Sequence, residues 1–159
     1  MADDRKHLLD LLNESREATR TALKGLDLET RIYTGANWRI RDILGHIAVW
    51  DMEVAKALRT FLQDGEYVIA NLDEDAFNEQ AVQERKALAG DQVLAEWEQS
   101  QKELIEAVQE IPSEKFPGDL LYPWGDERGS ITELVEYMVG HAAEHREEII
   151  KTIENTQED

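Results

Sequence analysis

Apolar residues recur three and four positions apart along most of this 159-residue chain. This spacing constrains the fold more than any other feature, because it places apolar side chains along one face of an α-helix. No segment shows the persistent alternation of apolar and polar residues that a half-buried strand requires, and glycine and proline gather between the helical segments. The pattern predicts an all-α protein.

Five helical segments are predicted, at about residues 4–26, 38–64, 73–88, 91–110 and 131–153. Asp3 or Asp4 is expected to cap the first segment, and Asp73 the third. Gly65 is expected to end the second in a left-handed conformation. The fourth should stop before Pro112 and Pro117. Ser130 and Glu133 have the spacing of a capping box for the fifth.

Four of these segments are long, and the third is short and lies between the second and the fourth. Long amphipathic helices joined in this way are typical of an antiparallel four-helix bundle, here with one extra short helix in a connection. The length of the chain fits one domain, spanning residues 1–159. A domain of this size buries enough surface to fold without a metal or a disulfide.

Composition restricts the functions that the chain can have. It contains no cysteine, so disulfides, thiolate nucleophiles and thiolate metal ligands are excluded. The lack of cysteine is consistent with a reducing compartment. Its formal net charge of −18 predicts repulsion from nucleic acid and from anionic lipid. No apolar run is long enough to cross a membrane, and the acidic N-terminus does not resemble a signal peptide. We therefore expect a soluble cytoplasmic protein with neither nucleic acid nor membrane as a partner.

Two histidines in the fifth segment, His141 and His145, are four residues apart and point the same way from a helix. At ~100° per residue His145 falls inside the apolar stripe of this segment and His141 on its margin. His46 lies at the edge of the apolar stripe of the second segment. Three neutral imidazoles with an open position form a known catalytic metal site. The alternative is that these histidines are packed or exposed side chains without a metal, as we expect for His7.

Several acidic and aromatic residues close to the histidines in sequence are further candidates. A carboxylate could accept a proton during hydrolysis or orient a histidine, and aromatic rings could line a pocket. The alternative for the acids is a solvated helix face, and for the aromatics the core. The chain has no glycine-rich phosphate loop and no Gly-x-Ser-x-Gly elbow, so catalytic residues stay unassigned. The candidates are Asp42, Asp51, Glu53, Glu144 and Glu148 among the acids, and Trp50, Tyr122 and Trp124 among the aromatics.

Two stretches resemble motifs of the DinB-like superfamily, namely residues 37–51, around His46, and residues 140–146, around His141 and His145. The superfamily includes damage-inducible proteins, thiol-dependent transferases and isomerases, and resistance proteins of the colibactin self-protection type. The resemblance covers nearly the whole chain. It implies long crossover connections in the bundle, homodimers, and His46, His141 and His145 as metal ligands. Arg39 departs from the serine or threonine usual at that helix start, and Asn78 lies in a segment that also resembles the family.

Two functions follow as hypotheses. The first is a metal-dependent enzyme, a hydrolase or a thiol-dependent transferase, acting on a small molecule. Zinc or nickel would be the ion, and a low-molecular-weight thiol would serve as co-substrate. The second is a non-catalytic protein of the same fold that binds or sequesters a small molecule and so confers resistance. A bundle whose histidines never bind metal is the third possibility.

Overall fold

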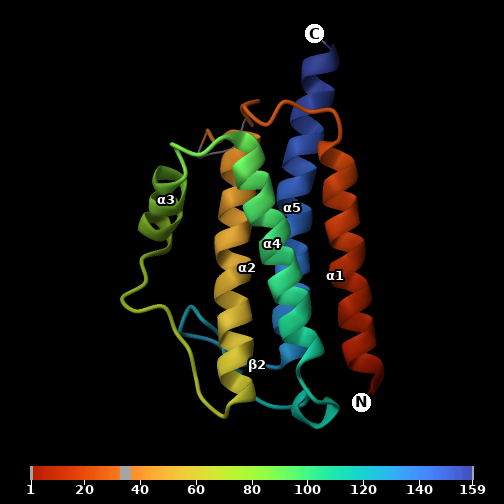
Figure 1. Cartoon of the computed structure of the whole chain (residues 1–159), viewed down its shortest axis with the longest axis vertical. Helices are drawn as coiled ribbons and strands as arrows, with labels where there is room; N and C mark the ends of the chain where they lie inside the picture. The colour runs from red at the N-terminus through yellow and green to blue at the C-terminus, as the bar shows by residue number, and fades with distance from the viewer. Residues whose placement is uncertain (1, 33–36, 159) are drawn as a thin grey trace.

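The computed structural model describes residues 2–32 and 37–158. Within these ranges the chain forms five α-helices, one short 3-10 helix and a pair of two-residue strands (Figure 1). The elements in chain order are α1 (Ala2–Leu23), α2 (Ile40–Leu62), α3 (Glu74–Glu84), α4 (Gly90–Gln109), η1 (Ser113–Lys115), β1 (Leu120–Leu121), β2 (Arg128–Gly129) and α5 (Ile131–Glu158). No helix of the described ranges is both long enough and apolar enough to cross a bilayer.

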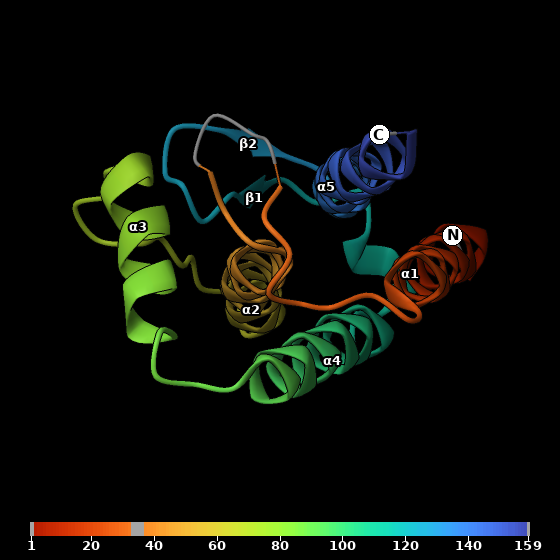
Figure 2. The ribbon, with the colours of Figure 1, turned by 90° about the horizontal axis from the view of Figure 1, so that it is seen from above.

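Helices α1, α2, α4 and α5 form the bundle, and α3 lies outside it next to α2 (Figure 2). The predicted all-α four-helix bundle with an extra short helix is therefore confirmed. Helices α1 and α5 run in one direction, and α2 and α4 run in the other (Figure 1). The last two are parallel because residues 63–89, which contain α3, return along the length of the bundle before α4 begins. Seen from above, β1 and β2 lie beside the gap between α2 and α5 (Figure 2).

The apolar stripes expected from the sequence form the core. Helix α2 buries most of one face, and its closest packing is against α4. Trp97 of α4 is almost wholly buried in this contact, among the apolar residues of α2 near its N-terminus. A second cluster fills the other end of the bundle and includes Leu8, Leu58, Leu104 and Leu134.

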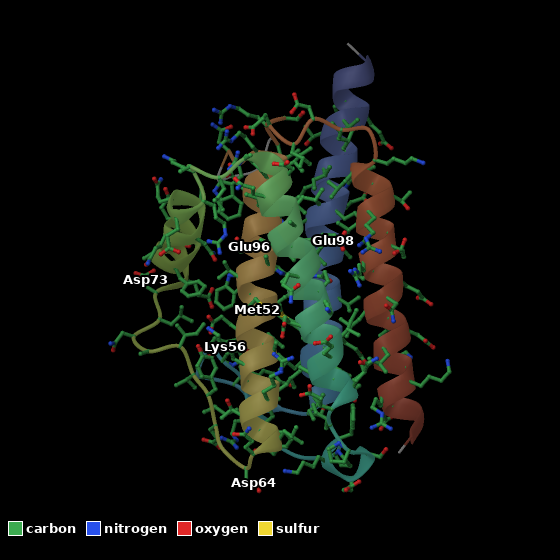
Figure 3. All side chains as sticks on the ribbon, viewed as in Figure 1. Met52, Lys56, Asp64, Asp73, Glu96 and Glu98 are labelled. Atoms are coloured by element: carbon green, nitrogen blue, oxygen red, sulfur yellow. The ribbon has the colours of Figure 1, made fainter. Side chains whose placement is uncertain are left out.

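Charged side chains join α4 to its neighbours on both sides (Figure 3). Glu96 and Glu98 are two residues apart and therefore point to different sides of the helix. Glu98 accepts hydrogen bonds from Arg16 and Arg20 of α1, and Glu96 accepts one from Arg85 at the end of α3. These contacts align α1 and the α3 segment against α4.

Some of the helix ends differ from the predictions. Asp73 caps α3 as expected, because its carboxylate accepts a hydrogen bond from Ala76 N at 3.2 Å. Helix α1 already begins at Ala2, so Asp3 and Asp4 lie within the helix and not at the N-cap position. It ends at Leu23 and not at Leu26.

The expected left-handed cap at Gly65 is wrong. Asp64 takes the positive φ, 66°, and the Gly65 amide bonds back to the Thr60 carbonyl at 2.9 Å. Aspartate tolerates this conformation better than most residues do. Its carboxylate also accepts a hydrogen bond from Lys115 at 2.8 Å. This partner is far away in the sequence, so the helix end could not be predicted from local residues.

Residues 118–130 contain structure that the sequence did not predict. Leu120 pairs with Gly129, and Leu121 with Arg128, in a short antiparallel ladder. Ser130 then caps α5 as predicted, accepting a hydrogen bond from Glu133 N at 3.1 Å. The Glu133 carboxylate reaches the Ser130 hydroxyl, 3.3 Å away, and not the backbone amide. Helix α5 continues to Glu158, beyond the predicted end at residue 153.

Candidate metal centre

The three predicted histidines meet between α2 and α5. The ring centroid of His46 lies 4.9 Å from that of His141 and 5.0 Å from that of His145, and the latter two are 4.7 Å apart. One ligand atom from each residue can be chosen so that all three lie within 4.8 Å of one another. Such a cluster could hold one metal ion.

Helix geometry explains why these rings meet. His141 and His145 are separated by one turn of α5, so both rings project from the same face of that helix. His46 lies on α2, and the Trp38 ring packs against it from the segment before the helix, with the centroids 5.0 Å apart. Contact between α2 and α5 is sparse compared with that between α2 and α4. The imidazoles therefore lie between two helices that pack less closely than α2 and α4 do.

The hydrogen-bond geometry does not satisfy three neutral rings. His141 Nε2 lies 3.0 Å from His46 Nε2 and 3.1 Å from His145 Nε2. His145 Nδ1 is 3.1 Å from Glu148 Oε2, which assigns the proton of that ring to Nδ1 and leaves Nε2 with a lone pair. A single N–H at His141 can point well at only one neighbour. At most one of the two Nε2 contacts is then a good hydrogen bond, whereas a cation between the nitrogens satisfies all three lone pairs.

Burial favours the neutral form that binds metals. It lowers the pKa of His46 to about 3, with His141 and His145 adding to this effect and Asn78 opposing it. Burial likewise lowers the pKa of His141 to about 4, with a contribution from His145. The ring atom His46 Nδ1 is buried and has no hydrogen-bond partner among the described residues. These rings are neutral at pH 7, which is the state that metal ligation requires.

A cavity of about 290 Å³ opens beside the histidines. His46 and His141 line it, and Met138 of α5 forms an apolar part of its wall. Helices α2, α3 and α5 and the loop between β1 and β2 all contribute residues to it. A volume of this size holds a small molecule or part of a larger one.

Two of the acidic candidates are engaged in hydrogen bonds elsewhere and do not contact the histidines. Asp42 was a candidate for orienting a histidine, but its carboxylate accepts a hydrogen bond from Arg39 N at 2.9 Å and so caps α2. This interaction supplies the cap that Arg39 itself lacks. Asp51 is buried and accepts a hydrogen bond from Gln101 of α4 at 2.6 Å. It lies five residues after His46, about 140° around the helix, and therefore faces α4.

The other three acidic candidates differ in their surroundings. Glu53 lies two turns from His46 and accepts hydrogen bonds from Tyr67 and Lys56. Glu144 is exposed. Glu148 alone contacts the cluster, through the His145 Nδ1 contact at 3.1 Å. It orients one ring and is not free to act as a base.

The aromatic candidates separate in the same way. Trp50 and Trp124 line the cavity, whereas the Tyr122 ring packs behind Trp124, and its hydroxyl donates to the Ser130 carbonyl at 2.9 Å. Asn78 also lines the cavity and accepts a hydrogen bond from Trp50 Nε1 at 2.7 Å. Sequence reasoning missed four other lining residues, because they lie in the β1–β2 loop, in the first turn of α3 or on the exposed side of α5. These residues are Glu74, Asp126, Glu127 and Tyr137.

Several solved structures have the same fold. YfiT from Bacillus subtilis, described as a probable metal-dependent hydrolase with an unusual four-helix bundle topology, is 16% identical with a TM-score of 0.78, and the match covers 96% of this chain and 87% of YfiT. A mycothiol-dependent maleylpyruvate isomerase is 15% identical with a TM-score of 0.75, over 91% of this chain and 60% of the isomerase. At these identities the likeness concerns the fold alone.

A third structure corrects the expectation about nucleic acid. The colibactin self-resistance protein ClbS, in complex with double-stranded DNA, is 8% identical with a TM-score of 0.76, over 93% of this chain and 94% of ClbS. The exclusion of nucleic acid on grounds of charge is therefore wrong, because a protein of this fold binds DNA. A net charge of −18 sums the whole surface and does not describe any single face of it.

Sequence comparison gives the family directly. No curated protein matches the chain. The family model of the DinB superfamily matches residues 6–149, which include all three histidines, the whole of α2 and α4, and most of α1 and α5. The resemblance of the two histidine motifs is confirmed by this match, and the chain belongs to the DinB superfamily.

Proposed function

We propose that this protein is a metal-dependent enzyme that acts on a small molecule, with His46, His141 and His145 holding one divalent ion. The observation that carries the proposal is the convergence of the three rings, with two Nε2 contacts of 3.0 and 3.1 Å that neutral imidazoles cannot both satisfy. Zinc or nickel fits an all-imidazole ligand set. The absence of cysteine fits a cytoplasmic protein, and a thiol as co-substrate is what the resemblance to the superfamily implies.

The reaction would be hydrolysis or transfer to a low-molecular-weight thiol. A divalent ion supplies a Lewis acid beside the cavity and lowers the pKa of a water or thiol that binds it. The chain itself contributes three things. Glu148 holds the His145 ring in one tautomer, Trp50 and Trp124 enclose the bound molecule, and the buried His46 places the reacting end deep in the cavity. The name of YfiT, a probable metal-dependent hydrolase, agrees with the first reaction class, and the name of the mycothiol-dependent isomerase agrees with the use of a thiol.

A second candidate is a protein that sequesters a small molecule without transforming it. The surroundings of the acidic candidates favour it, because Asp51 faces α4, Glu53 is engaged with Tyr67 and Glu148 with His145. None of these three is free to act as a general base. The neighbour ClbS is named a self-resistance protein, which is compatible with such a role.

Turnover distinguishes the two candidates. Protein purified without a histidine tag and loaded with Zn²⁺ or Ni²⁺ is assayed with p-nitrophenyl acetate, and with 2-mercaptoethanol plus 1-chloro-2,4-dinitrobenzene. An enzyme should accelerate at least one reaction, and His145→Ala should lose that activity while His7→Ala keeps it. Stoichiometric metal without turnover would favour sequestration. Less than about a tenth of a metal ion per chain after loading would contradict the proposed enzyme, because a three-histidine site holds one ion.

Glu148→Gln tests the hydrogen bond to the cluster. We expect it to weaken Zn²⁺ binding by about 10–100-fold, because partners of ligating histidines contribute this much to affinity. Isothermal titration calorimetry measures the change. Glu147→Gln is the matched control. The Glu147 side chain is exposed, and this substitution removes the same charge from the position next to Glu148. Equal affinities for the two variants would show that the contact to His145 has no role in metal binding.

A further inference from the structure

The cavity beside the histidines has an acidic mouth. Glu74 at the start of α3 and Asp126 and Glu127 in the β1–β2 loop all line it, and their side chains are exposed. His46, by contrast, is buried with 6% of its surface accessible. The carboxylates therefore lie toward solvent and the histidine toward the interior. No lysine or arginine of the described chain lines the cavity.

These carboxylates are not neutralised by the surrounding protein. Glu127 accepts one hydrogen bond, from the indole nitrogen of Trp124 at 3.0 Å. Glu74 and Asp126 receive neither a hydrogen bond nor an ion pair from the residues that the structure describes. Arg128, the first residue of β2 and the neighbour of Glu127 in sequence, is engaged with Asp119 and Glu66, which lie outside the cavity. The negative charge at the mouth is thus available to a ligand.

Aromatic rings stand beside these carboxylates. Trp50, Trp124 and Tyr137 line the cavity, with centroid distances of 6.4 Å between the two indoles and 5.4 Å between Trp124 and Tyr137. Tyr137 is 61% exposed, so its ring is accessible to a ligand. Aromatic faces attract cations, and nearby carboxylates strengthen that attraction in a partly desolvated site. Such a combination recognises ammonium groups and repels carboxylates and phosphates.

We propose that the cavity selects small molecules that carry an ammonium group, with the cation at the acidic aromatic mouth and an uncharged reactive group directed toward the histidines. This inference names the substrate class of the proposed enzyme. Only the placement of the reactive group toward the histidines rests on that proposed function. The selection of charge itself resides in residues of α2, α3, α5 and the β1–β2 loop. It therefore does not depend on a bound ion.

Calorimetry on metal-free protein tests the selection of charge. Three probes of similar size are titrated: benzyltrimethylammonium, benzyl alcohol and phenylacetate. We expect the cation to bind at least about tenfold more tightly than the other two, which is the effect expected of a partly buried cation–aromatic contact beside carboxylates. Equal affinities, tighter binding of phenylacetate, or no binding of any probe at 10 mM would overturn the proposal.

A triple variant, Glu74→Gln/Asp126→Asn/Glu127→Gln, tests the origin of the preference. It should bring the affinities of the three probes to within about threefold of one another, because only the uncharged aromatic walls remain. The control, Glu14→Gln/Asp91→Asn/Glu154→Gln, changes the net charge equally at exposed positions outside the cavity. This control should keep the preference for the cation. If it loses the preference as the triple variant does, the selection does not originate in the three carboxylates of the cavity.

The two proposals fail in different measurements. Absence of Zn²⁺ and Ni²⁺ binding would refute the proposed metal-dependent function. The preference of the metal-free cavity for cations would still be tested by the titrations with the three probes. Metal binding with no preference for the cation would refute the inference alone. The triple variant must keep the circular dichroism spectrum of the wild type, which shows that its fold is intact whether or not a metal binds.

Discussion

His46→Ala should lower the affinity for Zn²⁺ by at least about 100-fold, since even the indirect partners of metal ligands contribute 10–100-fold. His46 is the only ligand candidate on α2, and His141 and His145 both lie on α5. Without it, two imidazoles from one helix remain, which is one ligand fewer than catalytic sites of this class use. The measurement is calorimetric titration of tag-free protein with Zn²⁺ and with Ni²⁺.

Thermal unfolding provides a second measurement on the same variant. An ion that binds only the folded chain stabilises it. The gain in unfolding free energy grows with the logarithm of the ratio of the free ion concentration to the dissociation constant. Wild-type protein should therefore gain melting temperature when Zn²⁺ is added, and His46→Ala should gain little. His7→Ala is the control, because that histidine is exposed on α1. Equal stabilisation of His46→Ala and wild type by Zn²⁺ would mean that the ion binds elsewhere.

Asp51→Asn should stabilise the protein at pH 8, on the order of 4 kcal/mol by the relation between pKa shifts and stability. Burial raises the pKa of Asp51 to about 7, although a hydrogen bond from Gln101 opposes the shift. The folded chain thus disfavours the ionised carboxylate that the unfolded chain carries at neutral pH. Asparagine has the shape of the protonated acid and can still accept the hydrogen bond from Gln101.

The pH dependence has a defined sign. Below about pH 4 the carboxyl is protonated in both states, and the variant should equal the wild type in stability. Between about pH 4 and 7 the unfolded chain loses the proton first, so the wild type loses stability relative to the variant as the pH rises. Above pH 7 the difference should be constant. Urea unfolding of both proteins across this range measures it.

Asp126→Asn is the control for this series, because Asp126 is exposed. Its unfolding free energy should follow that of the wild type at every pH within about 0.5 kcal/mol, as for most surface substitutions. If Asp51→Asn is no more stable at pH 8 than at pH 4 relative to wild type, Asp51 ionises freely in the folded protein. The buried position of its carboxylate between α2 and α4 would then be wrong.

The bundle could be predicted because the spacing of apolar residues along each helix shows which face is buried. Ile43, Leu44 and Ile47 lie on one stripe of α2, and all three are buried. The local caps Asp73 and Ser130 could be predicted, whereas the end of α2 involves a distant contact between Asp64 and Lys115. The two-residue strands β1 and β2 are too short to show any alternation.

The candidate site could be predicted in its centre and not at its edges. Helical phase placed His141 and His145 on an inward face, and the family motif added His46. Proximity in sequence was misleading for Asp51, because five residues along a helix rotate a side chain away from the site. The mouth of the cavity joins Glu74 to Asp126, more than 50 positions apart. Neither has a local pattern, so only the fold brings them together.

A crystal structure of tag-free protein grown with Zn²⁺, with anomalous data collected on both sides of the zinc edge, tests the central claim most directly. The account predicts one strong peak bonded to Nε2 of His46, His141 and His145 at about 2.0–2.1 Å, with a further position open to the cavity. No peak between these rings, or a peak that His46 does not reach, would contradict it.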